Sequence, residues 1–292
     1  MLSFRPTILL AALVARYGLA SADCPAAWTD VATDLKSSFI TDGDCNDNAR
    51  AAIRLSFHDC FPGACDGSII LSDECTTRTE NTQLVDICST LGDVATQYDV
   101  GVADLIQFAA GEFPALGRRP LLSSVLPQAH FFRYLAFGIA SCANGPVISV
   151  LVGRTDNSTA NAADQIPGAN DDAATIVSDF AAKGFSATEL VALVGAHTTA
   201  KNLNGVGLDD TTTVWDTDFY TETANGTAPA SLNSDINLAS GTDTSSDWTS
   251  FGADSSAWAA AFVPAMEKLG LLGISDSSNF TDCSSVLTDA LA

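Results

Sequence analysis

The stretch RLSFHDCFPGACDGS, residues 54–68, gathers side chains that could carry out chemistry. Arg54 and His58 are four positions apart, so a helix would place both on one face, with Phe57 close by. A fixed cation beside a base suits a reaction in which a proton is moved and a bond is polarised. A histidine followed by an aspartate could also belong to a metal site or cap a helix, but the spacing of Arg54 and His58 favours a pocket for acid–base chemistry.

Oxygen-bearing side chains follow His58 at short range. Asp59 points away from the face that carries Arg54 and His58, and Asp66 and Ser68 come next. Oxygen ligands suit a hard cation such as Ca²⁺. Solvated surface charge is the usual explanation of any single aspartate, so the prediction of a metal site behind the pocket depends on the whole group.

A second candidate histidine lies in SATELVALVGAHT, residues 186–198. Ser186 and Glu189 match a capping box, which predicts the start of a helix. Apolar and histidine positions then recur at helical spacing, through Leu190, Leu193, Val194 and His197. This pattern places His197 on the buried face, where a lone histidine is more often a core residue than a ligand.

The surroundings of His197 repeat those of His58. Thr198 follows it directly, and LDDTTTVWD, residues 208–216, supplies further oxygens. Each of these two histidines therefore stands beside a group of possible ligands for a hard cation. The third histidine of the chain, His130, lies in a segment of different character that is described below.

Together these motifs resemble the secreted haem peroxidases of the plant–fungal superfamily, most closely the fungal secretory (class II) branch. RLSFHDC is similar to the signature of the distal helix, with Arg54, Phe57 and His58 above the haem. ELVALVGAHT is similar to the proximal signature, with His197 as the axial ligand of the haem iron. The resemblance covers nearly the whole mature chain except residues 111–135.

Two further positions match the same family. LNSD, residues 232–235, resembles the segment whose aspartate accepts the hydrogen bond of the proximal histidine, so Asp235 takes that role. Asn81, in TENTQL, matches the asparagine that orients the distal histidine. The proline that usually follows this asparagine in the family is Thr82 here.

The resemblance implies an H₂O₂-dependent haem peroxidase. His58 would take a proton from H₂O₂ and return it to the departing oxygen, and Arg54 would stabilise the charge that develops as the O–O bond breaks. His197 would donate electron density to the iron, strengthened by Asp235. The ferryl haem would then oxidise small phenolic or dye-like donors in one-electron steps. The alternative is a secreted acidic glycoprotein that keeps the peroxidase fold without activity.

The implied cofactors are one haem b and two Ca²⁺ ions. The distal ion would be held by side chains of Asp59, Asp66 and Ser68, with backbone oxygens near Pro62 and Ala64. The proximal ion would be held by Thr198, Asp209, Thr211 and Asp216, with the carbonyl of Val214. Each ion would brace a helix end that carries a histidine facing the haem.

The eight cysteines indicate four disulfides formed in an oxidising compartment. Zinc binding is a poor alternative, because the spacings are irregular and no CxxC pair occurs. The resemblance implies Cys24–Cys283 and Cys45–Cys142, as in fungal members, and Cys60–Cys65, as in the plant secretory branch. Cys75–Cys88 then remains as the fourth pair.

The positions that confer special donor specificity in the family differ here. Members that oxidise Mn²⁺ use three carboxylates near the haem edge, and the matching positions are Asp47, Ala51 and Leu203. One carboxylate is left where three are required. The resemblance therefore implies no Mn²⁺ oxidation.

Two aromatic sites of specialised members are also replaced. The exposed tryptophan of lignin-oxidising members corresponds to Ala192, and the proximal aromatic of the cytochrome-c-oxidising branch corresponds to Leu208. Ile166-Pro167 resembles the segment that lines the donor-access channel. What remains is a generic peroxidase for small phenols and dyes.

The elements that must position these residues are expected to be helices. The resemblance implies an all-α fold with very little β structure, in which two helical halves sandwich one b-type haem. The expected domain is residues 23–292, with a distal half of about 23–165 and a proximal half of about 166–292. No membrane-spanning segment is expected in it.

The N-terminus predicts secretion. Arg5, the apolar run 8–15 and the small residues 20–22 match a signal peptide of residues 1–22. A membrane anchor is the weaker alternative, because Arg16 interrupts a run too short to span a bilayer. Three glycosylation sequons, at Asn157, Asn225 and Asn279, agree with an extracellular protein.

The charge restricts the partners. The net charge of −22, from 35 acidic and 13 basic residues, lacks the basic surface of a nucleic-acid binder. The expected partners are H₂O₂ and small reducing substrates, with no nucleic acid and no membrane. We expect a monomer.

Residues 111–135, GEFPALGRRPLLSSVLPQAHFFRYL, differ in character from the rest. They hold three basic residues and one acidic residue, with three prolines and no regular apolar period. Without them, DLIQFAA would join AFGIASCANGP in one helical pattern. A surface loop is one explanation, but long loops without structure of their own are uncommon in compact domains. We favour a translated, unspliced intron.

Overall fold

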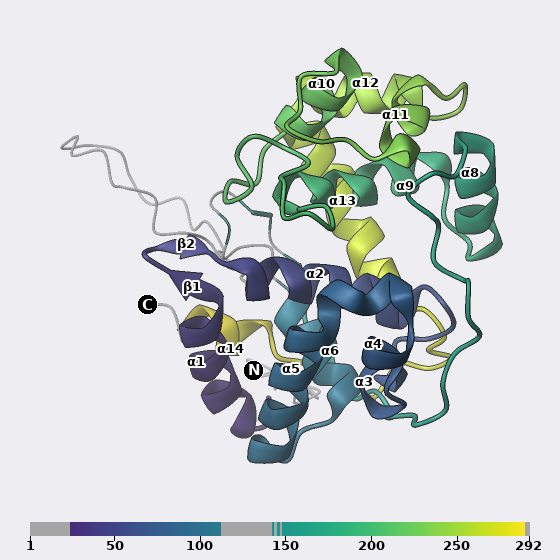
Figure 1. Cartoon of the computed structure of the whole chain (residues 1–292). Coiled ribbons are helices and arrows are strands. Elements are labelled where there is room, and N and C mark those ends of the chain that lie inside the picture. The colour runs from purple at the N-terminus through teal and green to yellow at the C-terminus, as the bar shows by residue number, and fades with distance from the viewer. Residues whose placement is uncertain (1–23, 112–141, 143–144, 147, 290–292) are drawn as a thin grey trace, which may run out of the picture.

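The computed structural model describes residues 24–111, 142, 145–146 and 148–289 (Figure 1). The expected signal peptide and all of the 111–135 segment except Gly111 lie outside these described residues. Both therefore remain predictions, as does the joining of the two helical patterns on either side of the segment.

Helices make up most of the described chain, as expected. The lower half in Figure 1 contains α1 Ala27–Phe39, α2 Asp47–Cys60, α3 Ser68–Leu71, α4 Glu74–Thr77, the 3₁₀ helix η1 Thr79–Leu84, α5 Val85–Tyr98 and α6 Val102–Ala110. The upper half contains α8 Ala173–Ala182, α9 Ala187–Val194, the 3₁₀ helix η2 Gly195–Thr199, α10 Asp218–Asn225, α11 Asn233–Ser240, α12 Ser245–Ala253 and α13 Ser255–Leu269.

Strands are few and short. In the described residues they are two antiparallel pairs of two-residue strands, β1 Ile40–Thr41 with β2 Asp44–Cys45, and β3 Leu151–Val152 with β4 Thr281–Asp282. In the registers of these pairs Ile40 lies opposite Cys45, and Leu151 lies opposite Asp282. The expected all-α fold with very little β structure is therefore confirmed.

The two helices with site motifs begin at side-chain caps. Before α2, the side chain of Asn46 accepts hydrogen bonds from the backbone N–H groups of residues 48 and 49, at 3.0 and 3.2 Å. Before α9, Ser186 and Glu189 form both hydrogen bonds of the predicted capping box, at 3.1 and 2.7 Å. Such caps supply partners for backbone donors that a helix start leaves unpaired, so each helix starts at a defined residue.

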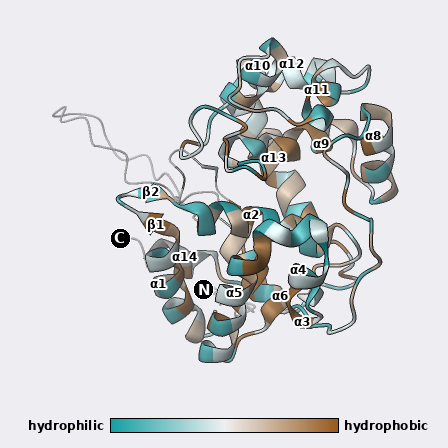
Figure 2. Ribbon diagram, in the orientation of Figure 1, coloured by the Kyte–Doolittle hydropathy of each residue, from teal (hydrophilic) through white to brown (hydrophobic). Residues whose placement is uncertain are grey.

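The buried apolar side chains form two clusters. One lies among α1, α2, α5 and α6, and all nine residues of α6 are buried. The other lies among α8 to α13 and is rich in aromatic rings. Helix α2 lies between them, because Leu55 packs in the first cluster and Ile53 in the second. Figure 2 shows this arrangement as hydrophobic ribbon on inward-facing segments and hydrophilic ribbon outside.

The end of the chain returns to the lower half. Strand β4 pairs with β3, and α14 Ser284–Asp289 packs against α1 (Figure 1). These final residues therefore lie against the lower half. The domain division expected near residue 165 stays a prediction.

The described chain contains four disulfides, two of which join parts that are far apart in the sequence. They are Cys24–Cys283, Cys45–Cys142 and Cys60–Cys65, which the resemblance implies, and Cys75–Cys88, the pair that then remained. The first closes 259 residues and the second 97. A native disulfide typically adds about 2–4 kcal/mol to the free energy of unfolding.

Within the described ranges, no helix has both the length and the apolar character needed to cross a bilayer.

Candidate active site

A cavity of about 430 Å³ lies between the two halves and is lined by both histidines of the sequence motifs. Its volume falls within the usual range for small-molecule sites. The α2 side contributes Arg54, Phe57 and His58, and the facing side contributes Leu190, Leu193, Val194, His197 and Asp235. The helical face predicted for residues 190–197 is therefore a wall of this cavity.

Three side chains meet on the distal side. His58 Nδ1 lies 2.7 Å from Asn81 Oδ1, and Arg54 Nε donates to His58 Nε2 at 3.1 Å. Asn81 is itself held by a 3.1 Å hydrogen bond from its amide to the Glu74 carbonyl. Because the Asn81 oxygen can only accept, His58 carries its proton on Nδ1 and keeps a lone pair on Nε2, which accepts the hydrogen bond from Arg54.

His58 is buried and electrically neutral. Burial, followed by the charge of Arg54, lowers the pKa of His58 to about 3, although the bond to Asn81 acts in the opposite direction. A neutral imidazole with an unprotonated Nε2 can accept a proton. The distal side is therefore equipped with a base and a fixed cation.

Sequence reasoning missed the partners that hold Arg54. Its guanidinium donates to the side-chain oxygen of Gln83 and, at 3.0 Å, to the carbonyl of Glu80. Gln83 in turn donates to the carbonyl of Asn202 at 2.9 Å, which joins the two sides of the cavity. The only feature of the sequence that could have indicated Gln83 as a partner of Arg54 is that it lies two residues after Asn81.

On the proximal side His197 faces a buried carboxylate. His197 Nδ1–H donates to Asp235 Oδ2 at 3.2 Å, and the Asp235 side chain is 1% exposed. The His197 ring also contacts the edge of Phe219, with ring centroids 5.6 Å apart. This bond fixes the ring and leaves Nε2 as the free ligand atom.

His197 lies in η2 rather than in a continuation of α9, which ends at Val194. At Gly195 the backbone approaches two side chains closely, because an added Cβ would meet the Tyr220 hydroxyl and, at 2.6 Å, the Trp258 indole nitrogen. A side chain at this position would therefore have no room. The tighter 3₁₀ turn brings His197 to the cavity.

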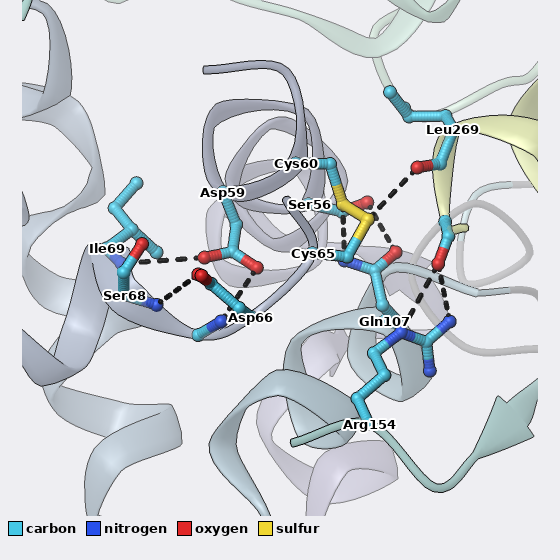
Figure 3. Close-up of a disulfide and its surroundings, with 12 residues drawn as sticks. Ser56, Asp59, Cys60, Cys65, Asp66, Ser68, Ile69, Gln107, Arg154 and Leu269 are labelled. Carbon is cyan, nitrogen blue, oxygen red and sulfur yellow. Dashed lines mark hydrogen bonds between the residues drawn. A yellow bond between two sulfur atoms is a disulfide. The ribbon is translucent and has the colours of Figure 1, made fainter. Parts of the chain in front are cut away.

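The predicted distal oxygen ligands gather behind the His58 helix (Figure 3). The carboxylate of Asp59 is buried and accepts from the backbone N–H groups of Gly67 and Ile69 at 3.1 and 3.5 Å. Asp66 accepts from the Ser68 N–H at 3.1 Å. Burial raises the pKa of Asp59 to about 8, with the nearby charge of Asp66 acting in the same direction.

The backbone oxygens proposed beside this group already have partners. The carbonyl of Pro62 accepts from the ammonium of Lys183 at 3.1 Å, and the carbonyl of Ala64 accepts from the Asp66 N–H at 3.0 Å. The Cys60–Cys65 disulfide borders the same loop, and Cys65 Sγ lies 3.0 Å from the Leu269 carbonyl of α13 (Figure 3).

The predicted proximal ligands also come together. Thr198 Oγ1 donates to Asp209 at 2.7 Å, and Thr211 Oγ1 lies 2.9 Å from Asp209 and 3.1 Å from Asp216. Burial raises the pKa of Asp216. Val214 belongs to the same turn, because its N–H donates to the Thr211 carbonyl at 2.7 Å. Asp209, Asp210 and Glu222 have carboxylate oxygens within 4.8 Å of one another.

A cationic network at the edge of the cavity was not foreseen. Asp47 Oδ1 accepts from Arg50 at 2.5 Å and from Lys201 at 2.8 Å. These two bonds, from Lys201 first and Arg50 second, lower the pKa of Asp47. Leu203 nearby is 77% exposed and carries no ligand atom.

The remaining specificity positions lie as follows. Ala192 and Leu208 are buried, and Leu208 lines the cavity. Ile166 and Pro167 line the cavity as well.

The cavity fits a haem. One wall offers an imidazole whose orientation is fixed by a carboxylate, and the apolar lining includes Phe57, Ile176, Phe180 and Phe262. The second carboxylate oxygen of Asp235 is buried without a partner in the described residues. A buried carboxylate that accepts the N–H of His197 is the environment that makes an imidazole a good iron ligand.

Residues 31–254 match the family model described as "Peroxidase". A peroxidase of Arthromyces ramosus and one of Coprinopsis cinerea are each 28% identical over 91% of this chain and 76% of their own length. Manganese peroxidase 3 of Phlebia radiata is 26% identical over 87% of this chain and 74% of its own length.

Proposed function

The chain belongs to the plant–fungal haem peroxidase family, and on that basis we propose that it uses H₂O₂ to oxidise small phenolic or dye-like donors in one-electron steps. The observation that carries the proposal is that one and the same cavity is lined by Arg54 and His58 from one half and by His197 from the other. We also propose that the protein is secreted, as its cysteines and N-terminal sequence favour.

The distal residues supply proton transfer. We propose that His58 Nε2 takes the proton of a bound H₂O₂ and returns it to the departing oxygen, acting as a general base and then as a general acid. Asn81 keeps the second ring nitrogen protonated and the ring in place. Arg54, held by Gln83 and the Glu80 carbonyl, directs its charge at the oxygen that becomes negative.

The proximal residues hold the cofactor. His197 Nε2 would ligate the iron of haem b, and the hydrogen bond to Asp235 holds the ring in a fixed orientation. Bound haem supplies the redox chemistry, which no side chain of this site can perform. The chain's own part is to bind it, orient it and move the protons.

Ile166 and Pro167 support an access route for small donors, because both line the cavity. The absence of a bulky aromatic at Ala192 and Leu208 agrees with direct donor access rather than transfer through those positions.

The experiment that tests the proposal is direct. Purified protein with haem should show a Soret band and should oxidise a phenolic dye only when H₂O₂ is added. A protein with the fold but no activity, the alternative function, would fail the second measurement.

Mn²⁺ is expected not to support efficient, saturable turnover. Ala51 and Leu203 cannot coordinate a hard cation, and the carboxylate of Asp47 is already bound to Arg50 and Lys201. Steady-state assays with Mn²⁺ as the donor test this. Strong Mn²⁺-dependent activity that is lost in Asp47→Ala would show that the site has been misplaced.

Removal of Ca²⁺ is expected to loosen the cavity. We propose that Asp59, Asp66, Ser68 and the carbonyls near Pro62 and Ala64 hold one ion, and that Thr198, Asp209, Thr211, Asp216 and the Val214 carbonyl hold another. Each group adjoins a cavity histidine, and without an ion its carboxylates repel one another.

Chelation of Ca²⁺ followed by thermal unfolding measures this effect. We expect a lower melting temperature and a changed Soret band, both restored by added Ca²⁺. If chelation changes neither quantity, while metal analysis confirms that the protein has lost its calcium, the bracing role is wrong.

A further inference from the structure

Arg54 differs from the other arginines of the described chain in the groups that hold it. Its guanidinium donates to His58 Nε2 at 3.1 Å and to the side-chain oxygen of Gln83. Its third acceptor is the Glu80 carbonyl, at 3.0 Å. An imidazole nitrogen, an amide oxygen and a peptide carbonyl are all uncharged here. The other described arginines are each paired with a carboxylate, in Arg50–Asp47, Arg78–Glu74 and Arg154–Asp104.

The charge of Arg54 is therefore held in place without being neutralised by a contact. Burial lowers the pKa of its guanidinium, so a carboxylate partner would make the buried cation less costly. The same carboxylate would weaken the attraction of the cation for any other negative group. Neutral acceptors thus suit a cation whose task is to stabilise a charge that develops only during the reaction.

Gln83 is the acceptor that links Arg54 to the facing half. Its side-chain nitrogen donates to the Asn202 carbonyl at 2.9 Å, across 119 residues of sequence. A guanidinium can only donate and a carbonyl can only accept, so the two partners decide which end of the amide faces each of them. A glutamate of the same shape could accept from Arg54 but could not donate to Asn202.

The Asn202 carbonyl is a firm anchor because it belongs to a turn, residues 201–207, that is closed by its own hydrogen bonds. Lys201 and Gly207 form an antiparallel bridge, and the Asn202 N–H donates to the Val206 carbonyl at 2.8 Å. The Asn202 side chain also accepts from the backbone N–H groups of residues 204 and 206, at 2.9 and 3.1 Å. The position of Arg54 is therefore tied to a well-bonded element of the facing half.

We propose that Gln83 is a positioning residue for the reaction with H₂O₂, which holds Arg54 from the facing half through a neutral amide so that the guanidinium keeps both its place and its charge. This inference rests on the proposed function. The competing role for Gln83 is purely structural, in which its bond to Asn202 only fastens the 201–207 turn to the lower half.

The test uses full-length protein loaded with haem and the variant Gln83→Met, which has a similar length but lacks the amide. Stopped-flow measurement should show that the rate constant with H₂O₂ falls by about 10–10²-fold, as expected when a catalytic group is slightly misplaced. Gln97→Met is the matched control, because Gln97 is exposed in α5 and does not line the cavity. It should react at the wild-type rate.

Fluoride provides a second measurement that involves no turnover. This small anion binds ferric haem, so its dissociation constant, read from the Soret band, reports how well the charge of Arg54 reaches the distal side. Gln83→Met should bind fluoride about tenfold more weakly or worse, as expected for a weakened charge-assisted hydrogen bond. A purely structural role of Gln83 would lower the melting temperature and leave the fluoride affinity unchanged.

Gln83→Glu separates the place of Arg54 from its charge. The carboxylate keeps an acceptor for Arg54 but offsets its charge and loses the bond to Asn202, so both the rate constant with H₂O₂ and the fluoride affinity should fall. If both stay at wild-type values, the neutral amide has no role and the proposal is wrong. This variant also carries the test if circular dichroism shows that Gln83→Met does not fold.

A double-mutant cycle shows whether Gln83 acts through Arg54. Arg54→Leu alone should slow the reaction with H₂O₂ by about 10²–10³-fold, the usual cost of losing such a donor. Gln83→Met should then add almost nothing on this background, because coupled residues are not additive. An equal effect of Gln83→Met with and without Arg54 would overturn the proposal.

The proposed function can fail separately from this inference. A wild-type protein that binds no haem, or that does not react with H₂O₂, would overturn the proposed function itself. A wild type that reacts with H₂O₂, beside a folded Gln83→Met protein with the same rate constant and the same fluoride affinity, would overturn only the role of Gln83.

Discussion

His58→Leu is expected to slow the reaction with H₂O₂ by about 10²–10⁴-fold, the usual contribution of general acid–base catalysis. Leucine fills a similar space but cannot take the peroxide proton. His58 is buried and its two ring nitrogens bond to Arg54 and Asn81, so its loss should leave the haem bound. Stopped-flow measurement of the reaction at several H₂O₂ concentrations gives the rate constant.

Two further variants distinguish the loss of the base from indirect effects of a substitution near the cavity. Asn81→Ala keeps the base but removes the acceptor that fixes its tautomer, so we expect a smaller loss than in His58→Leu. Thr82→Ala is a suitable control, because Thr82 is exposed and its hydroxyl donates to the Thr79 carbonyl at 2.7 Å, away from His58 and Asn81. A His58→Leu protein that reacts with H₂O₂ at nearly the wild-type rate would remove His58 from the mechanism.

Much of the site could be predicted from sequence because it is built from local patterns. Arg54 and His58 share a helix face as their spacing requires, and the Ser186–Glu189 capping box starts α9 as expected. Such patterns depend on helix geometry within a few residues and not on how the helices pack, so they can be recognised in the sequence alone.

What could not be predicted depends on contacts across the fold. Lys201 meets Asp47 from 154 residues away, and Gln83 meets the Asn202 carbonyl from 119 residues away. No spacing rule brings such residues together. The end of α9 at Val194 is a related case, because the crowding at Gly195 comes from Tyr220 and Trp258 on other helices.

The return of the C-terminal residues to the distal half has the same cause. Strand β4 and α14 are too short to reveal their partners by pattern, and they are held by pairing with β3 and by the Cys24–Cys283 disulfide. That disulfide was implied by the resemblance. The packing that accompanies it was not.

Changes at His197 should have a different effect from changes at His58, because the two histidines are proposed to do different work. His197→Gly removes the proposed iron ligand, so the Soret band should shift and the cofactor should be lost faster, even before H₂O₂ is added. Added imidazole should restore part of the band, since the glycine leaves room for it. His58→Leu should show neither effect.

Asp235→Asn tests the same side without removing the ligand. The carboxylate accepts the His197 Nδ1–H at 3.2 Å, and outer partners of this kind typically contribute 10–100-fold to affinity or activity. We therefore expect a loss of about 10–100-fold in the rate constant with H₂O₂. The reduction potential of the iron should rise, because the imidazole becomes a weaker electron donor.

Equal, mild effects of His197→Gly and His58→Leu would contradict the division of roles between the two histidines. Loss of an iron ligand and loss of a base have different consequences, the first for the iron and the second for proton transfer.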